Sequence, residues 1–555
     1  MESVRKAKDR LSKYPILIAK CSISAAKYSQ CVTRDLDIKK HSCDKEFQEF
    51  KKCLIEQAKA MKTRLKLQNC TMSSLKKHLL YSIVIRLLLI AYGEVQDQIS
   101  EVPYTDIDYR VVTDGARHIY NGRSPFNRHT YRYTPLLAIF LLPNIYLHRC
   151  FGKILFAAFD LVIAVIIKLI IVDEYHLLVS AQSNDDIKAK MEKKFSSSNG
   201  NGASKIKARL SFVSKKETAT KWFSTSDRMK FERMGNFAAY VWLYNPLTMV
   251  IATRGNGDAI TCALVLLSIY YLLKVQENAG NEKRNEKNVI MCGILHGLAI
   301  HFRLYPIFFS LAYYMYLSDI KNNIDGISSL FKCFLQPNRK QVLLIVSVLK
   351  MLIFTTGVFY LLYNYEFLYE SIIYHFVRKD TRHNFSLYFY LQYLNSASLR
   401  VNIIEKLLTI MPQLVLIILI SFHFCRTRQT IQFALLLISF IMVTYNTVIT
   451  SQYFVWFLSL LPLTVNNFRN LTLRQVIAMP SLWFIGQGLW LLAAFFLEFK
   501  GINSFDFIWL ASVIFFIINV VIVQILIENY DDSSDVGDHF QHLKFRLKNP
   551  TQKAC

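Results

Sequence analysis

Two aspartates one residue apart, Asp106 and Asp108, stand in a polar, aromatic and basic stretch of an otherwise largely apolar chain. The stretch reads YTDIDYRVVTDGARHIYNGRSPFNRHTYRYTP and runs from Tyr104 to Pro135. A positioned carboxylate can act as a general base towards a hydroxyl group. An aspartate can also simply cap a helix, because its side chain accepts hydrogen bonds from the free N–H groups at the helix start. The pair alone therefore leaves catalysis and capping open.

The side chains around the pair favour a chemical role. The segment also carries several arginines and tyrosines, which are Arg110, Arg117, Arg123, Arg128, Arg132, Tyr104, Tyr109, Tyr131 and Tyr133. Guanidinium groups bind phosphate through paired hydrogen bonds, and aromatic rings sit well at the headgroup level of a membrane. This combination suits a substrate that contains a sugar, a phosphate and a lipid.

Polar residues also interrupt later apolar runs, where charged side chains are costly and usually functional. They are Arg254, Gly255, Asn256 and Asp258 in ATRGNGDA, His301 and Arg303 in HFRLYP, and Arg378, Arg382, His383 and Asn384 in VRKDTRHNFS. Each could instead mark the end of a span or a snorkelling side chain. We interpret Arg86 and Asp160 as structural.

A short amphipathic helix is expected to position the aspartates. Helical spacing relates Tyr109, Val112, Ala116 and Ile119. Asn121-Gly122 is a typical stop signal. The sequence therefore places Asp106 and Asp108 at the start of this helix.

Composition indicates a membrane protein. The chain has 555 residues, of which 53% are hydrophobic, and a net charge of +26. Because the apolar runs are long and mostly end in Lys or Arg, we interpret the charge as membrane topology and not as nucleic-acid binding. The candidate spans are 79–93, 135–147, 154–172, 236–251, 257–274, 289–317 (one span, or two that break at Pro306), 341–363, 404–424, 429–449, 452–467, 474–497 and 505–528. Their uncertain ends allow about 10 to 13 spans.

The sequence thus predicts an all-α polytopic membrane protein with soluble segments at both ends. Residues 182–233 are rich in Ser, Gly, Asn and Lys and are expected to form a disordered basic insertion on the cytosolic side. Residues 529–555 form a polar tail. Residues 1–70 are expected to form a soluble helical hairpin.

Four cysteines mark that hairpin. Nine residues separate Cys21 from Cys31 and Cys43 from Cys53, which places each pair close to one helix face. In an antiparallel hairpin the partners would be Cys21–Cys53 and Cys31–Cys43. Scattered buried thiols are the alternative, and zinc is less favoured because its paired cysteines usually lie closer together.

Residues 1–65 resemble the twin-CX9C, or CHCH, proteins of the mitochondrial intermembrane space, especially a complex I assembly-factor family. The segments that carry the resemblance are RLSKYPILIAKCSISAAKYSQC and CDKEFQEFKKC. Nothing else in the chain calls for that compartment. We therefore hypothesise that two unrelated proteins are read here as one chain.

Residues 76–528 resemble the PIG-M-type family of GPI mannosyltransferases. The matching words, in the family's order, are YTDIDYRV-TD-AR, GRSP, TYRYTPLL, LPNIYL, WLYNPL, RGN-D, YHFVRKDTRHNFS-YFY, TSQYFVW, LWFIGQ and LEFKG-N-F-FIWLA. The resemblance implies a GT-C-type glycosyltransferase of the endoplasmic reticulum membrane, with the DxD loop in the lumen. It implies dolichyl-phosphate mannose as donor, a glucosaminyl phosphatidylinositol as acceptor, an α1-4-linked first mannose as product, and a small PIG-X-like membrane subunit as partner.

The implied reaction inverts the sugar carbon and needs one base. A lipid phosphate leaves without protonation, so cations can stabilise it. We expect Asp106 to be the base and Asp108 its helper, with the reverse open. Arg303, Arg382 and His383 are candidates for the phosphate, and the remaining substrate-binding candidates are Arg132, Asn256, Asp258, His301, Asn384, Gln452 and Tyr453. No cofactor is required on this reading, although a divalent metal remains compatible with it.

Two other function classes compete with the enzyme. A lipid transporter or flippase would line a pathway with its charged residues and would show an internal repeat, and we find no repeat. A mitochondrial assembly protein would act through the N-terminal segment alone.

Overall fold

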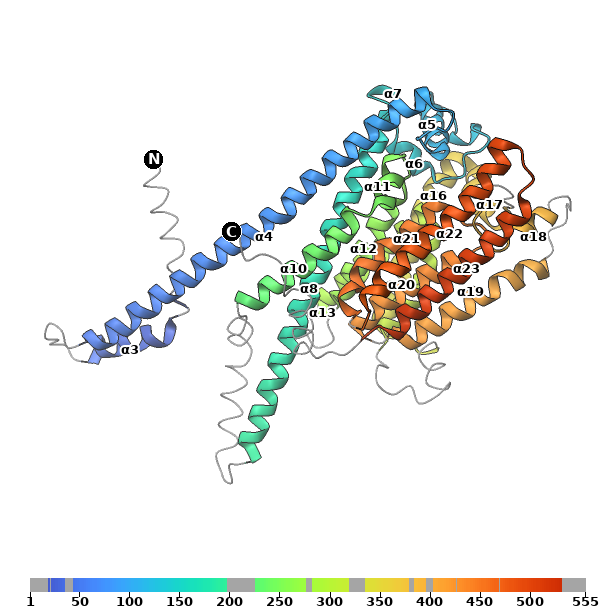
Figure 1. Cartoon of the computed structure of the whole chain (residues 1–555). Coiled ribbons are helices and arrows are strands. Elements are labelled where there is room, and N and C mark those ends of the chain that lie inside the picture. Colours follow the sequence, from blue (N-terminus) through green and yellow to red (C-terminus); the bar gives the residue numbers. More distant parts are fainter. Residues whose placement is uncertain are drawn as a thin grey trace. The chain divides into compact units, whose positions relative to one another are not determined.

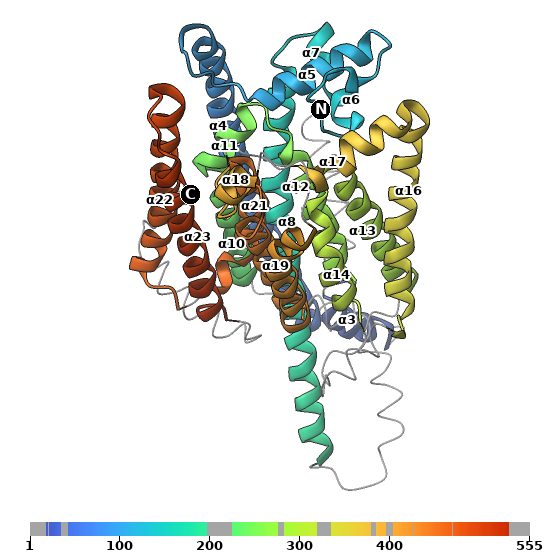
Figure 2. The same cartoon turned by 90° about the vertical axis from the view of Figure 1, so that its right-hand side faces the viewer.

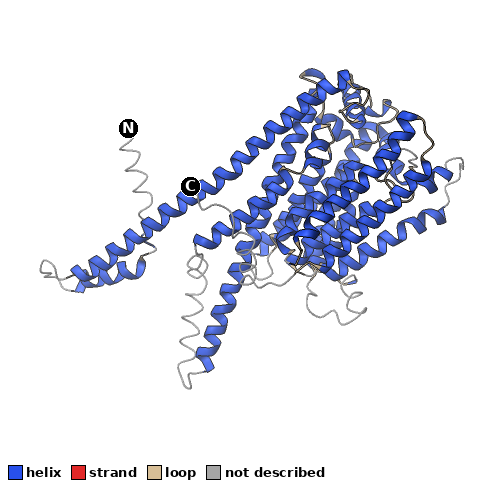
Figure 3. Ribbon diagram, viewed as in Figure 1, coloured by secondary structure: helices blue, strands red, loops and turns tan. Residues whose placement is uncertain are grey.

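The computed structural model of the chain describes most of the membrane region and parts of the N-terminus. The described residues are 18–19, 21–34, 43–196, 225–275, 282–318, 335–378, 384–395, 403–425, 427–468 and 470–531. Their regular elements are helices (Figure 3), besides an isolated bridge between Phe468 and Tyr530. Two compact units divide the chain. One holds residues 1–77, 220–233 and 551–555, and the other holds the rest.

The N-terminal unit contains helix α3 (Ser22–Arg34) and the first part of α4 (Asp44–Ile99). Disulfide bonds join Cys21 to Cys53 and Cys31 to Cys43. The Tyr28 ring on α3 lies 5.4 Å from that of Phe47 on α4. Residues 35–42, where we expected the turn, lie outside the described part of the chain.

The membrane unit confirms the all-α polytopic prediction. Six helical segments are long and apolar enough to cross a membrane within the described residues, and they are Leu75–Ile99, Phe151–Glu174, Arg339–Phe376, Leu407–Phe424, Leu473–Lys500 and Phe505–Glu528. Shorter apolar helices accompany them at Pro135–Tyr146, Asp258–Leu273 and Thr430–Thr444. The first predicted run, 79–93, is thus the middle of a longer span.

Several predicted spans fold as broken helices, and proline is the usual cause. Run 135–147 becomes α6 (Pro135–Phe140) and α7 (Pro143–Tyr146), each with a proline in its first turn. Run 236–251 divides at Asn245, between α10 (Thr225–Leu243) and α11 (Pro246–Thr253). Proline lacks an N–H group and is best tolerated in a first helical turn, although Pro412, Pro462 and Pro480 lie inside other helices of the chain.

Run 289–317 also breaks, near the Pro306 that we expected to divide it. It forms α13 (Glu282–Phe302), a 3₁₀ turn and α14 (Ser310–Tyr316). Run 452–467 contains only one short α-helix, α21 (Phe454–Thr464).

The predicted insertion 182–233 is partly helical. Helix α8 (Phe151–Ser196) continues into it, and α10 begins within it at Thr225. Residues 197–224 lie outside the described range, as do residues 532–555 of the polar tail. The start of the tail packs on the membrane unit, where the Tyr530 ring stacks on Phe433 at 3.9 Å.

The remaining helices pack mainly with sequence neighbours. They are α12 (Asp258–Leu273), α16 (Arg339–Leu368), α17 (Tyr374–Val377), α18 (Phe389–Leu394), α19 (Ile403–Phe424), α20 (Arg428–Thr444), α22 (Leu473–Lys500) and α23 (Phe505–Glu528). α13 packs against both α12 and α16, and α22 against α23. α22 and α23 run side by side in Figures 1 and 2.

The polar stretch that follows the first span forms a small cap. Helix α5 (Ile107–Tyr120), α6 and α7 gather at one end of the membrane helices (Figures 1 and 2). The apolar face of α5 joins a buried cluster with α6 and α16, which contains Val112, Ala116, Phe126, Tyr131 and Phe367. The two aspartates therefore stand on a packed support.

Candidate active site

Asp106 caps helix α5, as the sequence predicted. Its Oδ1 accepts a hydrogen bond from the backbone N–H of Asp108 (3.1 Å), and its backbone is extended. Tyr109, Val112 and Ala116 are buried on the inner face of the helix. The cap orients the Asp106 carboxylate and leaves Oδ2 outside this bond.

A buried network fixes the residue that precedes the cap. The backbone N–H of Thr105 donates to Asp97 Oδ1 (2.9 Å), and Lys153 Nζ donates to Thr105 Oγ1 (2.7 Å). Lys153 is almost fully buried and also contacts Glu94 Oε1 at 2.8 Å. Charged groups at this depth persist because each one has a partner.

The loop after α11 holds the same segment from the other side. The Asp106 N–H donates to the carbonyl oxygen of Arg254 (3.0 Å). The Tyr104 hydroxyl lies 2.7 Å from Thr253 Oγ1. Gly255 has φ +96°, and a Cβ there would lie 2.5 Å from Cδ2 of Tyr109. Only glycine combines this backbone conformation with such close approach of a ring.

Burial raises the pKa of Asp106, and the neighbouring Asp108 carboxylate raises it further. Arg254 opposes this by favouring the charged form, while Asp258 adds to the increase. A carboxylate with a raised pKa is a better proton acceptor than an ordinary aspartate. The surroundings thus suit Asp106 to accept a proton.

Asp108 is linked to residues from distant parts of the chain. Gln452 donates from Nε2 to Asp108 Oδ2 (3.2 Å). Tyr133 and Arg303 line a small hollow together with Asp108, and the Arg303 guanidinium lies 4.9 Å from the centre of the Tyr133 ring. Burial raises the pKa of Tyr133, and the Asp108 charge raises it further, so the phenol stays protonated.

Asp258 and Arg303 form an ion pair beside this hollow. Arg303 donates from Nε to Asp258 Oδ1 over 2.6 Å. The Asp258 side chain is completely buried, and its N–H donates to Asn256 Oδ1 (2.9 Å). Asn256 therefore fixes the start of α12, and Asp258 fixes Arg303.

A cavity of about 770 Å³ adjoins the hollow and shares Tyr133 and Arg303 with it. Arg132, Arg303 and Arg378 line it, and all three lie within electrostatic range of His375. The rest of its wall is mainly aromatic, amide and apolar, and includes Tyr388, Gln392, Gln413, Leu414, Met442, Tyr445, Asn446, Tyr453 and Trp456. Such a cavity suits a ligand with an anionic head and an apolar tail.

Six of the predicted site residues line the hollow or the cavity, and Asp108, Asn256 and Arg303 are those at the hollow. Arg132, His301, Arg303 and Tyr453 line the cavity. His301 Nε2 lies 2.8 Å from Thr134 Oγ1, and the Tyr453 ring stacks on Trp456 at 4.2 Å.

Two groups of candidates behave differently. Asn384 is fully buried and holds a loop, because its Nδ2 donates to the Thr447 carbonyl (3.0 Å) and its Oδ1 accepts from the N–H of Ile449 (2.8 Å). Arg382 and His383 lie outside the described residues.

Tyr133, His375 and Trp456 belong to the site but were not among its predicted residues. Tyr133 lies in the TYRYTP stretch, whose density of arginine and tyrosine was the available signal. His375 and Trp456 lie within two of the words that match the PIG-M-type family, YHFVRKDTRHNFS-YFY and TSQYFVW, and that resemblance was the available signal for them.

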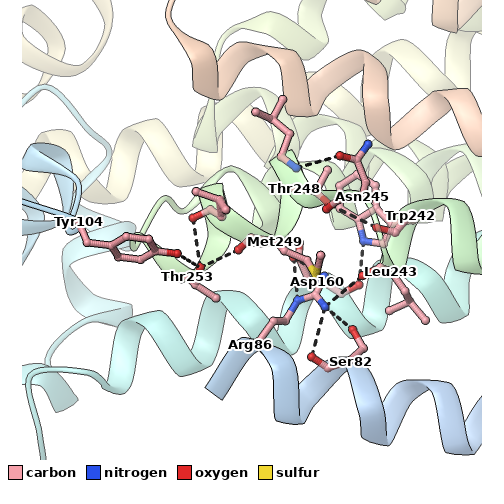
Figure 4. Close-up of polar contacts among 12 residues, drawn as sticks. Ser82, Arg86, Tyr104, Asp160, Trp242, Leu243, Asn245, Thr248, Met249 and Thr253 are labelled. Carbon is pink, nitrogen blue, oxygen red and sulfur yellow. Dashed lines mark hydrogen bonds and ion pairs between the residues drawn. The ribbon is translucent and has the colours of Figure 1, made fainter. Parts of the chain in front are cut away.

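Arg86 and Asp160 form a buried pair at membrane depth, consistent with the structural role expected for them. Arg86 Nη2 lies 3.0 Å from Asp160 Oδ2, and its Nη1 donates to the Leu243 carbonyl (3.3 Å). Trp242 donates from Nε1 to the Asp160 carbonyl (3.0 Å). Figure 4 shows how this pair ties α4, α8 and α10 together, near the Tyr104–Thr253 contact.

Comparison with known proteins relates this chain to an enzyme family. The family model described as "Mannosyltransferase (PIG-M)" matches residues 251–527. GPI mannosyltransferase 1 of Dictyostelium discoideum is 34% identical over 82% of this chain and 92% of its own length. The "GPI alpha-1,4-mannosyltransferase I, catalytic subunit" of Danio rerio is 34% identical over 80% of this chain and 95% of its own length. GPI mannosyltransferase 1 of Saccharomyces cerevisiae is 32% identical over 79% and 91%, respectively. With relatives this similar along nearly their full lengths, the chain belongs to the PIG-M family of mannosyltransferases.

Proposed function

We propose that the chain transfers the first, α1-4-linked mannose of the GPI core from dolichyl-phosphate mannose to a glucosaminyl phosphatidylinositol. One observation carries the proposal. Asp108 of the aspartate pair lines a hollow that shares Tyr133 and Arg303 with a cavity, and this cavity combines arginines with an apolar wall. The Danio rerio relative is named a GPI alpha-1,4-mannosyltransferase, which supports the α1-4 linkage.

Asp106 is the proposed base. An acceptor hydroxyl oxygen attacks the mannosyl carbon, its proton passes to the Asp106 carboxylate, and the bond from that carbon to the donor phosphate breaks. The raised pKa of Asp106 supports this role, because a base works best when its pKa approaches the working pH. Asp108, held by Gln452, orients the base or the acceptor.

Arg303 is the proposed contact for the departing phosphate, and Arg378 lines the same cavity. Fixed cations stabilise charge that develops on a leaving group, so the reaction requires neither a general acid nor a metal. Arg382 and His383 belong to the same proposal. The aromatic wall formed by Tyr453 and Trp456 would pack against the sugar or the lipid.

The endoplasmic reticulum membrane is the proposed location, with the DxD loop in the lumen and a small PIG-X-like subunit as partner. Lys76 and Lys77 at the start of the first span favour its cytosolic placement. The site then faces the lumen at the other end of that span.

A microsome assay tests the activity. Labelled dolichyl-phosphate mannose and glucosaminyl phosphatidylinositol should yield a mannosylated lipid with the parent chain. Asp106→Ala and Asp108→Ala should each lower transfer by at least about 100-fold, in line with the loss of a positioned base. Normal transfer by both variants would refute the assignment of the pair.

We further propose that residues 1–70 are not part of the mature enzyme. A helix that crosses the membrane once places the residues before and after it on opposite sides, and Leu75–Ile99 is such a helix. A lumenal DxD loop thus requires a cytosolic hairpin, yet disulfides rarely persist in the cytosol. A hairpin with two disulfides suits a separate, oxidising compartment.

A tryptic peptide map tests this point. A peptide that crosses residues 60–80 in the purified enzyme would refute the separation. The chain without residues 1–70 should transfer mannose normally. Mitochondrial staining of the full chain would favour the assembly-protein alternative over the enzyme.

A further inference from the structure

The C-terminal end of α16 is bent out of regular helix geometry close to the site. Asn364 has φ +52° and ψ −148°, inside what is otherwise a continuous helix. A π-helical turn follows at Tyr369–Ile373 before α17 begins. A non-glycine residue in this region of φ is strained, and π-helical turns are frequent at functional sites. Such geometry persists only where surrounding contacts hold it.

Several contacts join this bent end of α16 to the loop between α5 and α6. The Arg132 guanidinium pairs with Glu370 and lies 4.2 Å from the centre of the Tyr374 ring. Ser371 donates from Oγ to the carbonyl oxygen of Tyr133 (2.7 Å), and His375 from Nε2 to that of Arg132 (3.1 Å).

Further contacts fasten the other end of the loop to the bend. Ser124 donates from Oγ to Glu366 Oε2 (3.0 Å). The Phe126 ring lies 5.9 Å from Tyr363 and 6.4 Å from Phe367. Polar and apolar contacts thus join residues 124–134 to the bend along its whole length.

The residue at the centre of this arrangement is Tyr133. Its carbonyl is held by Ser371, and its side chain lies beside Asp108 and under Arg303. We infer that the bent end of α16 acts as a latch that holds Tyr133 between the aspartate pair and Arg303. Glu370 is the positioning residue of this latch. Arg132 is then a structural partner of Glu370 and not a phosphate ligand.

Arg132 could either position the loop or bind phosphate, and exchanging the charges of Arg132 and Glu370 separates these two roles. If the pair positions the loop, Glu370→Gln and Arg132→Gln should each lower kcat about 10- to 100-fold, because small misplacements in a site are costly. The double variant Arg132→Glu with Glu370→Arg should recover to within about threefold of the parent, since the pair is restored with opposite polarity. If Arg132 binds phosphate directly, the double variant should stay inactive and Glu370→Gln should remain active.

Glu286→Gln is the matched control. Glu286 pairs with Arg339 at the opposite end of the same helix (2.9 Å), so its loss should leave kcat unchanged. A comparable loss in this control would mean that α16 responds to any broken ion pair, which would overturn the inference.

A second measurement does not depend on activity. This inference rests on the proposed function for its kinetic readout, but hydrogen exchange of the backbone amides in residues 124–134 does not. Exchange should accelerate in Glu370→Gln and stay unchanged in Glu286→Gln, because only the first releases the loop. Unchanged exchange in Glu370→Gln would overturn the latch even if mannosyl transfer were lost. Accelerated exchange in an enzyme without the proposed transfer would contradict the function and keep the latch.

A backbone variant provides an independent check. Asn364→Gly should preserve the bend and kcat, because glycine adopts this φ without strain. Asn364→Val should straighten the helix and lower kcat, because a β-branched residue cannot adopt it. Equal activity in the two variants would show that the bend is not required.

Discussion

Arg303 donates to Asp258 through Nε and not through its terminal nitrogens, over a distance of 2.6 Å. Asp258 is completely buried, whereas Arg303 is partly exposed and lines the cavity. The carboxylate therefore binds the Nε of the guanidinium group and leaves the two terminal nitrogens outside this bond. This orientation suits an arginine whose terminal nitrogens are to bind a phosphate.

Asp258→Asn is expected to lower kcat/KM for the donor by more than a loss of folded protein would explain. The substitution keeps the shape but removes the charge that orients Arg303, so kcat/KM for the donor should fall by about 10- to 100-fold, as expected when an oriented cation is lost from a site. Breaking a buried pair also costs about 3–5 kcal/mol of stability. Steady-state kinetics and thermal unfolding in detergent separate the two effects. Glu286→Gln, which breaks a largely exposed pair with Arg339, should change neither. An unaltered donor KM and kcat in Asp258→Asn would contradict this role.

The pH dependence should identify Asp106 as the base. Transfer requires its ionised form, so kcat/KM should rise as pH rises through its pKa. Burial and Asp108 raise that pKa, which places the rise above the usual range for aspartate.

Two variants should move this rise in opposite directions. Asp108→Asn removes a neighbouring negative charge and should shift the rise to lower pH in the residual activity. Arg254→Gln removes a cation that favours ionisation and should shift it to higher pH. The pH profile of kcat/KM measures both. Shifts of the same sign would exclude Asp106 as the titrating group.

Gly255→Ala should displace the elements that support the aspartate pair. The new Cβ would lie 2.5 Å from the Tyr109 ring, and the backbone has φ +96°, so α5 or the loop after α11 must move. We expect at least a tenfold loss of kcat, since about 1 Å of misplacement can cost 100-fold. Gly488→Ala is the control, because no neighbouring atom lies within 4 Å of its added Cβ. It should be neutral or stabilise α22 by up to about 1 kcal/mol.

The Arg86–Asp160 pair should matter for folding and not for chemistry. Replacing either partner alone leaves a buried charge and should cost about 3–5 kcal/mol. The double variant Arg86→Met with Asp160→Leu should cost less than the sum of the two, because no charge remains. Thermal unfolding in detergent measures this difference. Figure 4 shows that the pair also meets the Leu243 carbonyl, which a methionine cannot satisfy, so a residual loss is expected.

Local sequence patterns predicted the parts of this site that local physics decides. Asp106 caps α5 because helical periodicity begins directly after it and because aspartate is a favoured cap. The break near Pro306 and the all-helical membrane architecture follow in the same way from proline chemistry and apolar runs.

Local sequence patterns could not predict which distant residues meet at the site. Asp108, Tyr133, Arg303 and Gln452 meet through tertiary packing, which no periodicity encodes. Hydropathy also overstated helix length, because it cannot tell a broken apolar run from a continuous one, as at Pro143 and Pro246. The strained Asn364 follows directly after the predicted span 341–363, and the residue types around it do not predict its conformation.

Asp106 combines two demands that rarely coincide in one side chain. Asparagine or serine would cap α5 equally well but could not take up a proton, and glutamate could take up the proton but is a poor cap. The hydrogen bond that Oδ1 accepts from the helix orients the carboxylate, so the cap and the proposed base use the same side chain. We therefore expect no neutral substitution of Asp106. If Asp106 is the base, a substitution that keeps the cap should abolish transfer, and a substitution that keeps the acid should weaken the start of α5.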